Sequence, residues 1–203
     1  MLFIGICGAS GSGKSTLAEG LQQELGDRCL VLQQDAYYLD HPDMTFEQRV
    51  KLNYDEPTIF DHDLLLQDVQ TLMAGQPITR KHYDYARHRR DDLDVLLYPR
   101  DVVILEGIHT FSDARLRELM FLKLYVKLDP DICLLRRIRR DIKERGRDID
   151  GIITQYLTTV KPMYEQYIKH YAADADIIVS GDDSKHRIID LLVGYVQDAL
   201  GAS

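Results

Sequence analysis

Tryptophan is absent from the 203-residue chain, cysteine occurs only three times, and no apolar run approaches the ~20 residues that span a membrane. Cys7, Cys29 and Cys133 lie far apart and form no C-x-x-C pair, which argues against a disulfide framework and against a zinc site. The opening apolar run is too short for a signal peptide. These absences predict a cytoplasmic protein that has no membrane partner.

Positive charge is also scarce. The chain has 25 Lys and Arg against 33 Asp and Glu, and its net charge is −8. Nucleic acids usually bind to a basic face, so this balance disfavours a nucleic-acid partner. The hydrophobic content of 45% is ordinary for a globular protein, and the length suits a single domain over residues 1–203.

The start of the chain carries the strongest motif. The apolar run Leu2–Cys7 precedes Gly8–Ser15, which fits the phosphate-binding pattern G-x-x-x-x-G-K-[ST], and leucines at helical spacing follow. A chance Gly/Ser linker would lack these strand-like and helix-like flanks. Lys14 would contact the β- and γ-phosphates, and the Ser15 hydroxyl would ligate Mg²⁺. The predicted nucleotide-binding residues are Gly8, Ser10, Gly11, Ser12, Gly13, Lys14, Ser15 and Thr16.

Four more strand-like runs follow and alternate with helical patterns. This alternation predicts an α/β fold, in which a five-stranded parallel sheet carries helices on both faces and binds ligands at the carboxyl ends of its strands. We expect Pro162 to kink the fourth of the later helices. The expected strands are Leu2–Cys7, Cys29–Asp35, Asp101–Gly107, Phe121–Leu128 and Ala175–Ser180, and the expected later helices are Asp63–Ala74, Asp113–Met120, Asp131–Arg145, Asp150–Tyr171 and His186–Leu200.

A small β insertion is expected at residues 76–98. Ile78–Tyr85 and Val95–Tyr98 are short and strand-like, and they bracket the charged segment Ala86–Asp94. Tyr83 and His88 lie on this insertion. A lone histidine is more often structural, but aromatic and imidazole groups together could stack on a flat heterocycle.

Two acidic residues follow predicted strands. Glu106 closes an apolar strand, where it would hold Mg²⁺ through water; a helix-capping acid is the alternative, but the apolar strand makes burial of an unused charge costly. Asp35 ends the second strand. It could accept the proton of an attacking hydroxyl near the γ-phosphate, or it could cap the next segment, and spacing alone does not separate these roles.

Seven basic residues lie between Arg136 and Arg147. They could form a solvated helix face, with Asp141 and Glu144 as ion-pair partners. Alternatively, residues 136–150 form a lid whose guanidinium groups neutralise charge on a transferring phosphoryl group. Arg139 is expected to face solvent in either case.

These motifs resemble the uridine kinase (uridine–cytidine kinase) family of P-loop nucleoside kinases. The resemblance extends from the P-loop to about Val179, and the E-R-G-R-D string with the downstream V-K-P-M is its most specific part. Besides the P-loop, the matching strings are Gln34–Tyr38, Asn53–Pro57, Tyr83–Tyr85 with His88 and Arg90, Ile104–Ile108, Arg136–Asp148, Gln155–Tyr156 and Val160–Met163.

The resemblance implies that ATP or GTP, with Mg²⁺, phosphorylates the 5′-hydroxyl of uridine and usually of cytidine. It implies that Asp35 is the general base and that Asp55 and Arg137 bind the ribose 2′- and 3′-hydroxyls. It also implies a homotetramer and feedback inhibition by CTP or UTP. The remaining implied contacts are Tyr38 and Gln155 beside the ribose, Tyr83, His88 and Arg147 at the pyrimidine edge, and Arg140 and Arg145 at the phosphates.

The chain departs from the family pattern in places. Glu56 stands where N-[FY]-D-H-P has histidine, His109–Thr110 replaces an aliphatic pair after E-G-I, and Ser180–Asp182 replaces P-R-G. These changes leave the phosphate machinery intact and bear on nucleoside specificity and feedback control. Two alternatives stay open: the same fold acting on another small acceptor, such as a different nucleoside, a sugar phosphate or pantothenate, and a nucleotide-binding regulator without catalysis.

Overall fold

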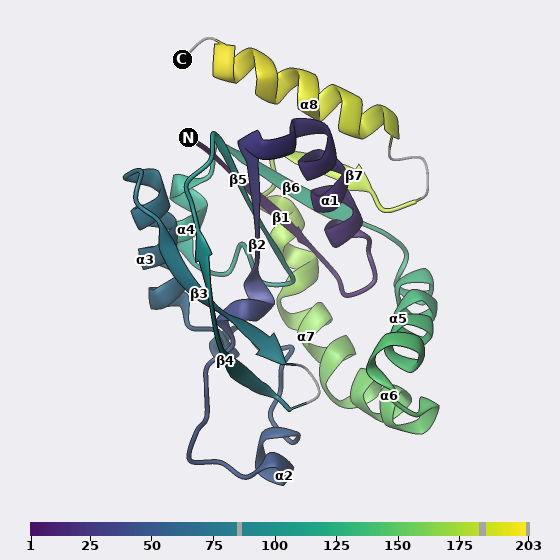
Figure 1. The fold of residues 1–203 in the computed structure, drawn as a ribbon. Coiled ribbons are helices and arrows are strands. Elements are labelled where there is room, and N and C mark those ends of the chain that lie inside the picture. Colours follow the sequence, from purple (N-terminus) through teal and green to yellow (C-terminus); the bar gives the residue numbers. More distant parts are fainter. Residues whose placement is uncertain (85–86, 183–185, 202–203) are drawn as a thin grey trace.

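A five-stranded parallel sheet forms the centre of the molecule, in the order β2-β5-β1-β6-β7 (Figure 1). The computed structural model describes residues 1–84, 87–182 and 186–201, with the backbone alone at 81, 82 and 91–93. The sheet and all five strand positions were predicted from the sequence and are confirmed. The strands are β1 (Leu2–Gly8), β2 (Cys29–Gln33), β5 (Val102–Gly107), β6 (Leu122–Lys127) and β7 (Ile177–Ser180).

Helices cover both faces of this sheet, because successive strand side chains point to opposite sides and both sides are apolar. Ile4 and Ile6 of β1 pack against helices α1 and α8, whereas Phe3 and Cys7 pack on the opposite face. No helix within the described ranges is long and apolar enough to cross a bilayer. The covering helices are α1 (Lys14–Leu25) and α8 (His186–Gly201) on one face, and α3 (His62–Met73), α4 (Ala114–Leu119) and the 3₁₀ segment Ile168–Ala173 on the other.

An antiparallel hairpin, β3 (Ile78–Asp84) and β4 (Arg89–Leu97), stands apart from the main sheet. The second strand begins earlier than the predicted Val95, because the charged residues from Arg89 onward extend the pairing with β3. Ile78 and Tyr83 of the hairpin pack into the core, whereas Arg89 and Asp94 are exposed, so charged residues on the outer side do not end the strand here. Tyr85, the predicted end of the first strand, lies outside the described residues.

Helix α5 (Pro130–Arg145) is followed by a helical run whose geometry changes along its length. The predicted Asp150–Tyr171 helix is divided into α6 (Ile149–Gln155), a π turn and α7 (Lys161–Gln166), and then the 3₁₀ segment. The π turn, Tyr156–Val160, ends just before the predicted kink site at Pro162. Proline has no N–H to continue the helical ladder, which is a reason for the wider turn before it.

The polar segment after β2 is irregular with short helical pieces. Gln34–Tyr37 forms a 3₁₀ turn, so Asp35 lies just beyond the strand rather than at its last position. Tyr37 anchors this turn: its ring is fully buried, and its hydroxyl donates to Asp68 Oδ2 of α3 at 2.9 Å. The remaining pieces are α2 (Phe46–Arg49) and the 3₁₀ turn Pro57–Ile59.

The Tyr37→Phe substitution should lower the free energy of unfolding by about 1–3 kcal/mol, because it leaves the buried Asp68 carboxylate without its hydroxyl donor. Urea unfolding monitored by circular dichroism measures this loss. Tyr195→Phe is the matched control, since Tyr195 is half exposed on α8 and stacks on Phe121. Equal stability of Tyr37→Phe and the control would contradict the anchoring role of the Tyr37 hydroxyl.

Candidate active site

The P-loop joins β1 to α1 and needs glycine at two positions with positive φ. Gly11 has φ +84° and Gly13, the residue before α1, has φ +95°. A Cβ on Gly11 would lie 2.4 Å from the carbonyl oxygen of Cys133, so the loop packs directly on α5. Ser12 is fully buried and Gly8 packs on the backbone of β6, so these two predicted residues shape the loop rather than line a cavity.

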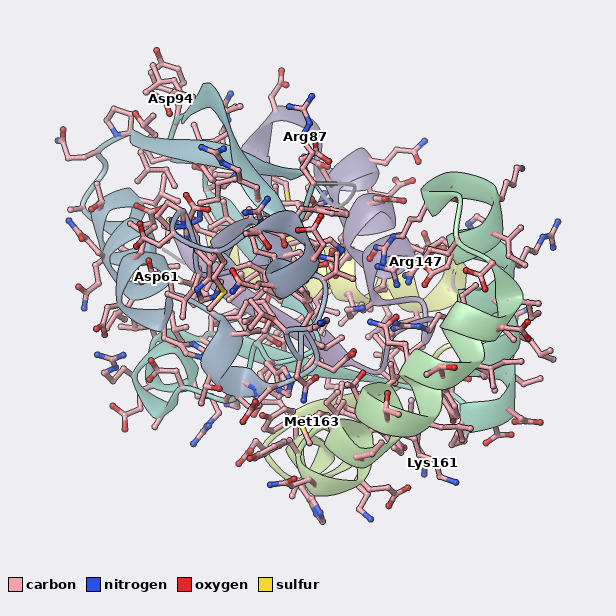
Figure 2. The ribbon with its side chains drawn as sticks, turned by 90° about the horizontal axis from the view of Figure 1, so that it is seen from below. Asp61, Arg87, Asp94, Arg147, Lys161 and Met163 are labelled. Carbon is pink, nitrogen blue, oxygen red and sulfur yellow. The ribbon has the colours of Figure 1, made fainter. Side chains whose placement is uncertain are left out.

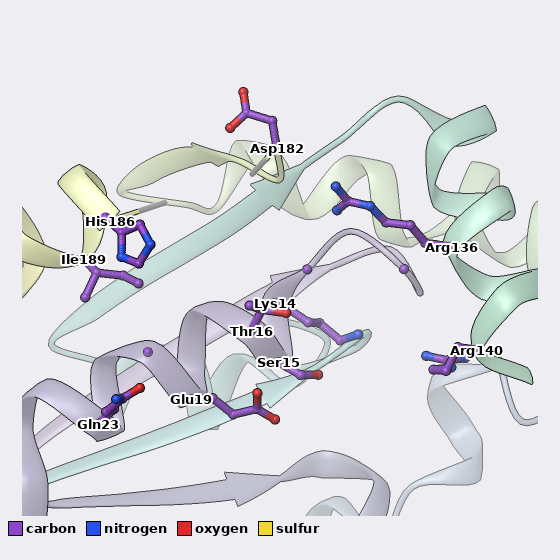
Figure 3. Close-up of a pocket in the computed structure, with 13 residues that line it drawn as sticks. Lys14, Ser15, Thr16, Glu19, Gln23, Arg136, Arg140, Asp182, His186 and Ile189 are labelled. Atoms are coloured by element: carbon purple, nitrogen blue, oxygen red, sulfur yellow. The ribbon is translucent and has the colours of Figure 1, made fainter. Parts of the chain in front are cut away.

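A cavity of about 570 Å³ opens over the P-loop and α1 (Figure 3). Lys14 and Arg140 extend towards each other at one end of this cavity, which we call the donor cavity. The guanidinium of Arg136 donates to the carbonyl oxygen of Gly181 at 2.8 Å and so ties α5 to the loop after β7. The residues that line the donor cavity are Gly11, Gly13, Lys14, Ser15, Thr16, Glu19, Gly20, Gln23, Arg136, Arg140, Asp182, His186 and Ile189.

A second cavity of about 320 Å³, here called the acceptor cavity, shares Lys14, Ser15 and Arg140 with the first. It lies between the β3–β4 hairpin and the α5–α6 segment, which project beyond the carboxyl ends of the strands (Figure 1). All predicted acceptor-side residues converge here from distant parts of the chain. The predicted site residues in its lining are Ser10, Lys14, Ser15, Asp35, Tyr38, Asp55, Tyr83, His88, Glu106, Arg137, Arg140, Arg145, Arg147 and Gln155.

Glu106 and Ser15 form the part of the site suited to a cation. Ser15 Oγ donates to Glu106 Oε1 at 3.2 Å, while Glu106 Oε2 is buried and accepts no hydrogen bond from the described residues. Burial raises the pKa of Glu106, and the Lys14 ammonium opposes that shift. A hydroxyl and a carboxylate oxygen beside a P-loop lysine match the hard-oxygen chemistry that Mg²⁺ prefers, so these residues fit such an ion.

Asp55 and Arg137 form a buried ion pair on the acceptor side. The distance from Arg137 Nη1 to Asp55 Oδ1 is 3.9 Å, and Thr159 Oγ1 donates to Asp55 Oδ2 at 3.1 Å. Burial raises the pKa of Asp55 and lowers the pKa of Arg137, and the attraction between the two groups partly offsets each shift. Two adjacent groups of this kind can accept from and donate to a pair of neighbouring hydroxyls.

Aromatic rings line part of the acceptor cavity. The ring centroids of Tyr38 and Tyr83 lie 4.9 Å apart, and those of Tyr54 and His88 lie 4.8 Å apart. Burial lowers the pKa of His88, and the nearby Arg147 lowers it further, so the imidazole stays neutral at pH 7. A neutral imidazole among tyrosine rings can stack on and hydrogen-bond a planar heterocycle.

Most arginine side chains of the basic segment are partly or fully buried, among them that of Arg147, which is labelled in Figure 2. Arg139 is exposed, as predicted. Arg137 Nη2 and Arg147 Nη1 both donate to Gln155 Oε1, at 2.9 and 2.7 Å. Helical spacing suggested that Asp141 is an ion-pair partner on a solvated helix face. Asp141 is instead fully buried among these arginines.

His109 is a residue of the site whose role was missed from the sequence. It is fully buried, its Nε2 lies 2.7 Å from the carbonyl oxygen of Asp55, and its Nδ1 lies 3.0 Å from Tyr171 Oη. A carbonyl only accepts, so Nε2 carries the proton and Tyr171 donates to Nδ1. The departure at His109–Thr110 from an aliphatic pair was the available signal, but the contact partners are 54 and 62 residues away.

The parallel sheet, the P-loop after its central strand and the arginine-lined cavity define an α/β P-loop kinase. Within that class the chain belongs to the phosphoribulokinase/uridine kinase family, whose model matches residues 3–185. A uridine kinase of Lactiplantibacillus plantarum is 46% identical over 97% of this chain and 95% of its own length. A uridine kinase of Bacillus subtilis is 44% identical over 97% of this chain and 94% of its own length.

Solved structures of lower identity share the fold. Phosphoribulokinase from Rhodobacter spheroides has a TM-score of 0.65 at 14% identity, covering 88% of this chain and 69% of its own. D-glycerate 3-kinase from Cryptococcus neoformans has a TM-score of 0.60 at 17% identity, covering 89% of this chain and 86% of its own. At these identities the likeness concerns the fold alone.

Folding stability should depend on His109 between about pH 6.5 and pH 4. Burial lowers the pKa of His109 to about 4, so the native protein holds a neutral imidazole where the unfolded chain binds a proton. Its contribution is complete above pH 6.5 and is lost as the pH falls towards 4, which amounts to about 3 kcal/mol. Urea unfolding of the wild type and of His109→Gln across this range measures the difference.

In His109→Gln the loss of stability on acidification should be smaller by that amount, because glutamine does not titrate. His170→Gln, a substitution of an exposed histidine, should retain the wild-type dependence. An unchanged pH dependence in His109→Gln would refute the assignment of a buried neutral imidazole.

Proposed function

We propose that the protein is a uridine kinase that transfers the γ-phosphoryl group of ATP or GTP to the 5′-hydroxyl of uridine or cytidine. One observation carries this proposal: the acceptor cavity joins Asp35, the Asp55–Arg137 pair and the P-loop lysine in a single space. The names of the curated relatives at 44–46% identity agree with it. The family resemblance adds the expectation of a homotetramer, and the cysteine usage adds that of a cytoplasmic location.

On the donor side, the P-loop N–H groups and Lys14 would hold the triphosphate, with Arg140 and Arg145 beside the transferring group. Ser15 and Glu106 are the residues that would hold Mg²⁺. The bound ion would supply positive charge opposite the phosphoryl oxygens. The arginines act in the same sense, because a guanidinium placed at the developing charge stabilises the transition state.

On the acceptor side, Asp35 would accept the proton of the 5′-hydroxyl as its oxygen attacks the γ-phosphorus. The new bond joins the 5′-oxygen to phosphorus, the bond to the β–γ bridging oxygen breaks, and the nucleoside diphosphate leaves. Asp55 and Arg137 would hold the ribose 2′- and 3′-hydroxyls. The residues proposed to contact the rest of the nucleoside are Tyr38 and Gln155 near the ribose and Tyr83, His88 and Arg147 at the base.

The Asp35→Asn substitution should lower kcat about 10²- to 10⁴-fold, because asparagine cannot take the hydroxyl proton. The Kd of a non-hydrolysable ATP analogue should stay within about twofold of the wild-type value, since Asp35 is placed on the acceptor side. A coupled assay of ADP release and calorimetry measure the two quantities. Asp40→Asn, five residues along and exposed, is the control. Near-normal turnover of Asp35→Asn would exclude Asp35 as the general base.

A panel of acceptors tests the proposed function itself. The wild type should phosphorylate uridine or cytidine with a kcat/KM at least about 100-fold above that for the 2′-deoxy forms, because the deoxy sugar leaves buried polar groups unpaired. Asp55→Ala should lose most of this preference, whereas Glu56→Gln should keep it. Efficient phosphorylation of a non-nucleoside, with no activity on uridine or cytidine, would overturn the proposal.

A further inference from the structure

A single carboxylate lies at the centre of the lid arginines. Asp141 on α5 is fully buried, and four guanidinium groups lie within 3.6 Å of its oxygens. The shortest contacts come from Arg140, whose Nη2 and Nε lie 2.8 and 2.9 Å from Oδ1. The other distances are 3.6 Å for Arg137 Nε, 3.6 Å for Arg145 Nη1 and 3.5 Å for Arg147 Nη1.

Four guanidinium groups therefore share the carboxylate of Asp141. Arg140 Nε donates a hydrogen bond to Oδ1 of this carboxylate, while Oδ2 accepts none from the described residues despite being buried. Arg137 Nε is likewise buried without an acceptor. Burial lowers the pKa of Arg137, and the nearby guanidinium groups of Arg140 and Arg145 lower it further, so these like charges repel one another around Asp141.

These four arginines belong to both halves of the site. Arg140 lines the donor and the acceptor cavity, and its Nη2 lies 3.4 Å from Ser10 Oγ in the P-loop. Arg137 and Arg147 line the acceptor cavity, where Arg137 is the partner of Asp55. The side chain of Asp141 thus contacts arginines that would hold the phosphates and arginines that would hold the nucleoside.

We propose that Asp141 is a positioning residue that couples the two cavities, so that binding of the phosphate donor tightens binding of the nucleoside. This inference rests on the proposed function. Oxygens of a bound triphosphate attract Arg140 and Arg145 and so reduce the competition for Asp141. The carboxylate then holds Arg137 and Arg147 more firmly at the acceptor side. By thermodynamic linkage, the nucleoside tightens donor binding by the same factor.

Calorimetry with uridine tests the coupling. For the wild type, the Kd of uridine should fall about 10-fold when the protein is saturated with Mg²⁺ and adenylyl imidodiphosphate, within the range usual for linked sites. We call the Kd of uridine without the analogue, divided by its Kd with the analogue, the uridine ratio. In Asp141→Asn, which keeps the side-chain shape but loses the charge, the uridine ratio should fall to about 1. The analogue alone should bind Asp141→Asn as tightly as the wild type or more tightly, because the donor side gains net positive charge.

That last readout separates positioning from a structural role, since a loosened lid would weaken binding of the analogue as well. Asp148→Asn is the matched control. Asp148 is an exposed acid of the same segment that caps α6 through the N–H of Gly151, and asparagine caps equally well. Its uridine ratio should match that of the wild type.

Equal uridine Kd values with and without the analogue in the wild type would overturn the coupling. This measurement uses the wild-type protein alone, so it does not depend on the folding of any variant. A uridine ratio in Asp141→Asn equal to that of the wild type, or weaker binding of the analogue to this variant, would overturn the role of Asp141. Failure of the proposed function is distinguishable, because it appears as absent uridine turnover and absent uridine binding in both states. Normal turnover with equal Kd values rejects the coupling alone.

Discussion

The parallel pairing of β1 with β5 on one side and β6 on the other is the constraint on which the site depends. Its register sets Ile6 opposite Glu106, so the strand that feeds the P-loop ends beside the strand that carries the acid. The pairing of β2 with β5 then sets Gln33 opposite Glu106, two residues before Asp35. Parallel strands end at a common edge, and this is why residues about 70 positions apart share one cavity.

Charge is handled differently at the two ends of this cavity. Near the P-loop, buried Glu106 stands beside Lys14 and has an unused oxygen, an arrangement that suits a cation. Beside α5, four guanidinium groups gather around one buried carboxylate, Asp141. The proposed triphosphate with its metal ion would complement both ends, because it would present anionic oxygens to the arginines and a cation to the acid.

Rigid neighbours support the groups that would contact the nucleoside. The turn that carries Asp35 is held by the Tyr37 hydroxyl on Asp68, and the backbone of Asp55 is held by the His109 imidazole. Gln34 Oε1, in the turn that carries Asp35, accepts a hydrogen bond from the backbone N–H of His109 at 2.9 Å, so the two supports are linked. Side chains fixed in this way keep their geometry without a ligand, which lowers the cost of ordering the site upon binding.

The sequence by itself determined the P-loop, the parallel sheet with helices on both faces, the hairpin and the convergence of Asp35 and Glu106, because local patterns and short motifs encode these features. The tertiary structure alone decided that Asp141 is buried among guanidinium groups and that His109 supports Asp55. Helical spacing says which residues share a face, but burial depends on which distant segment covers that face. The lengthened β4 likewise depends on its pairing with β3, which the local sequence does not contain.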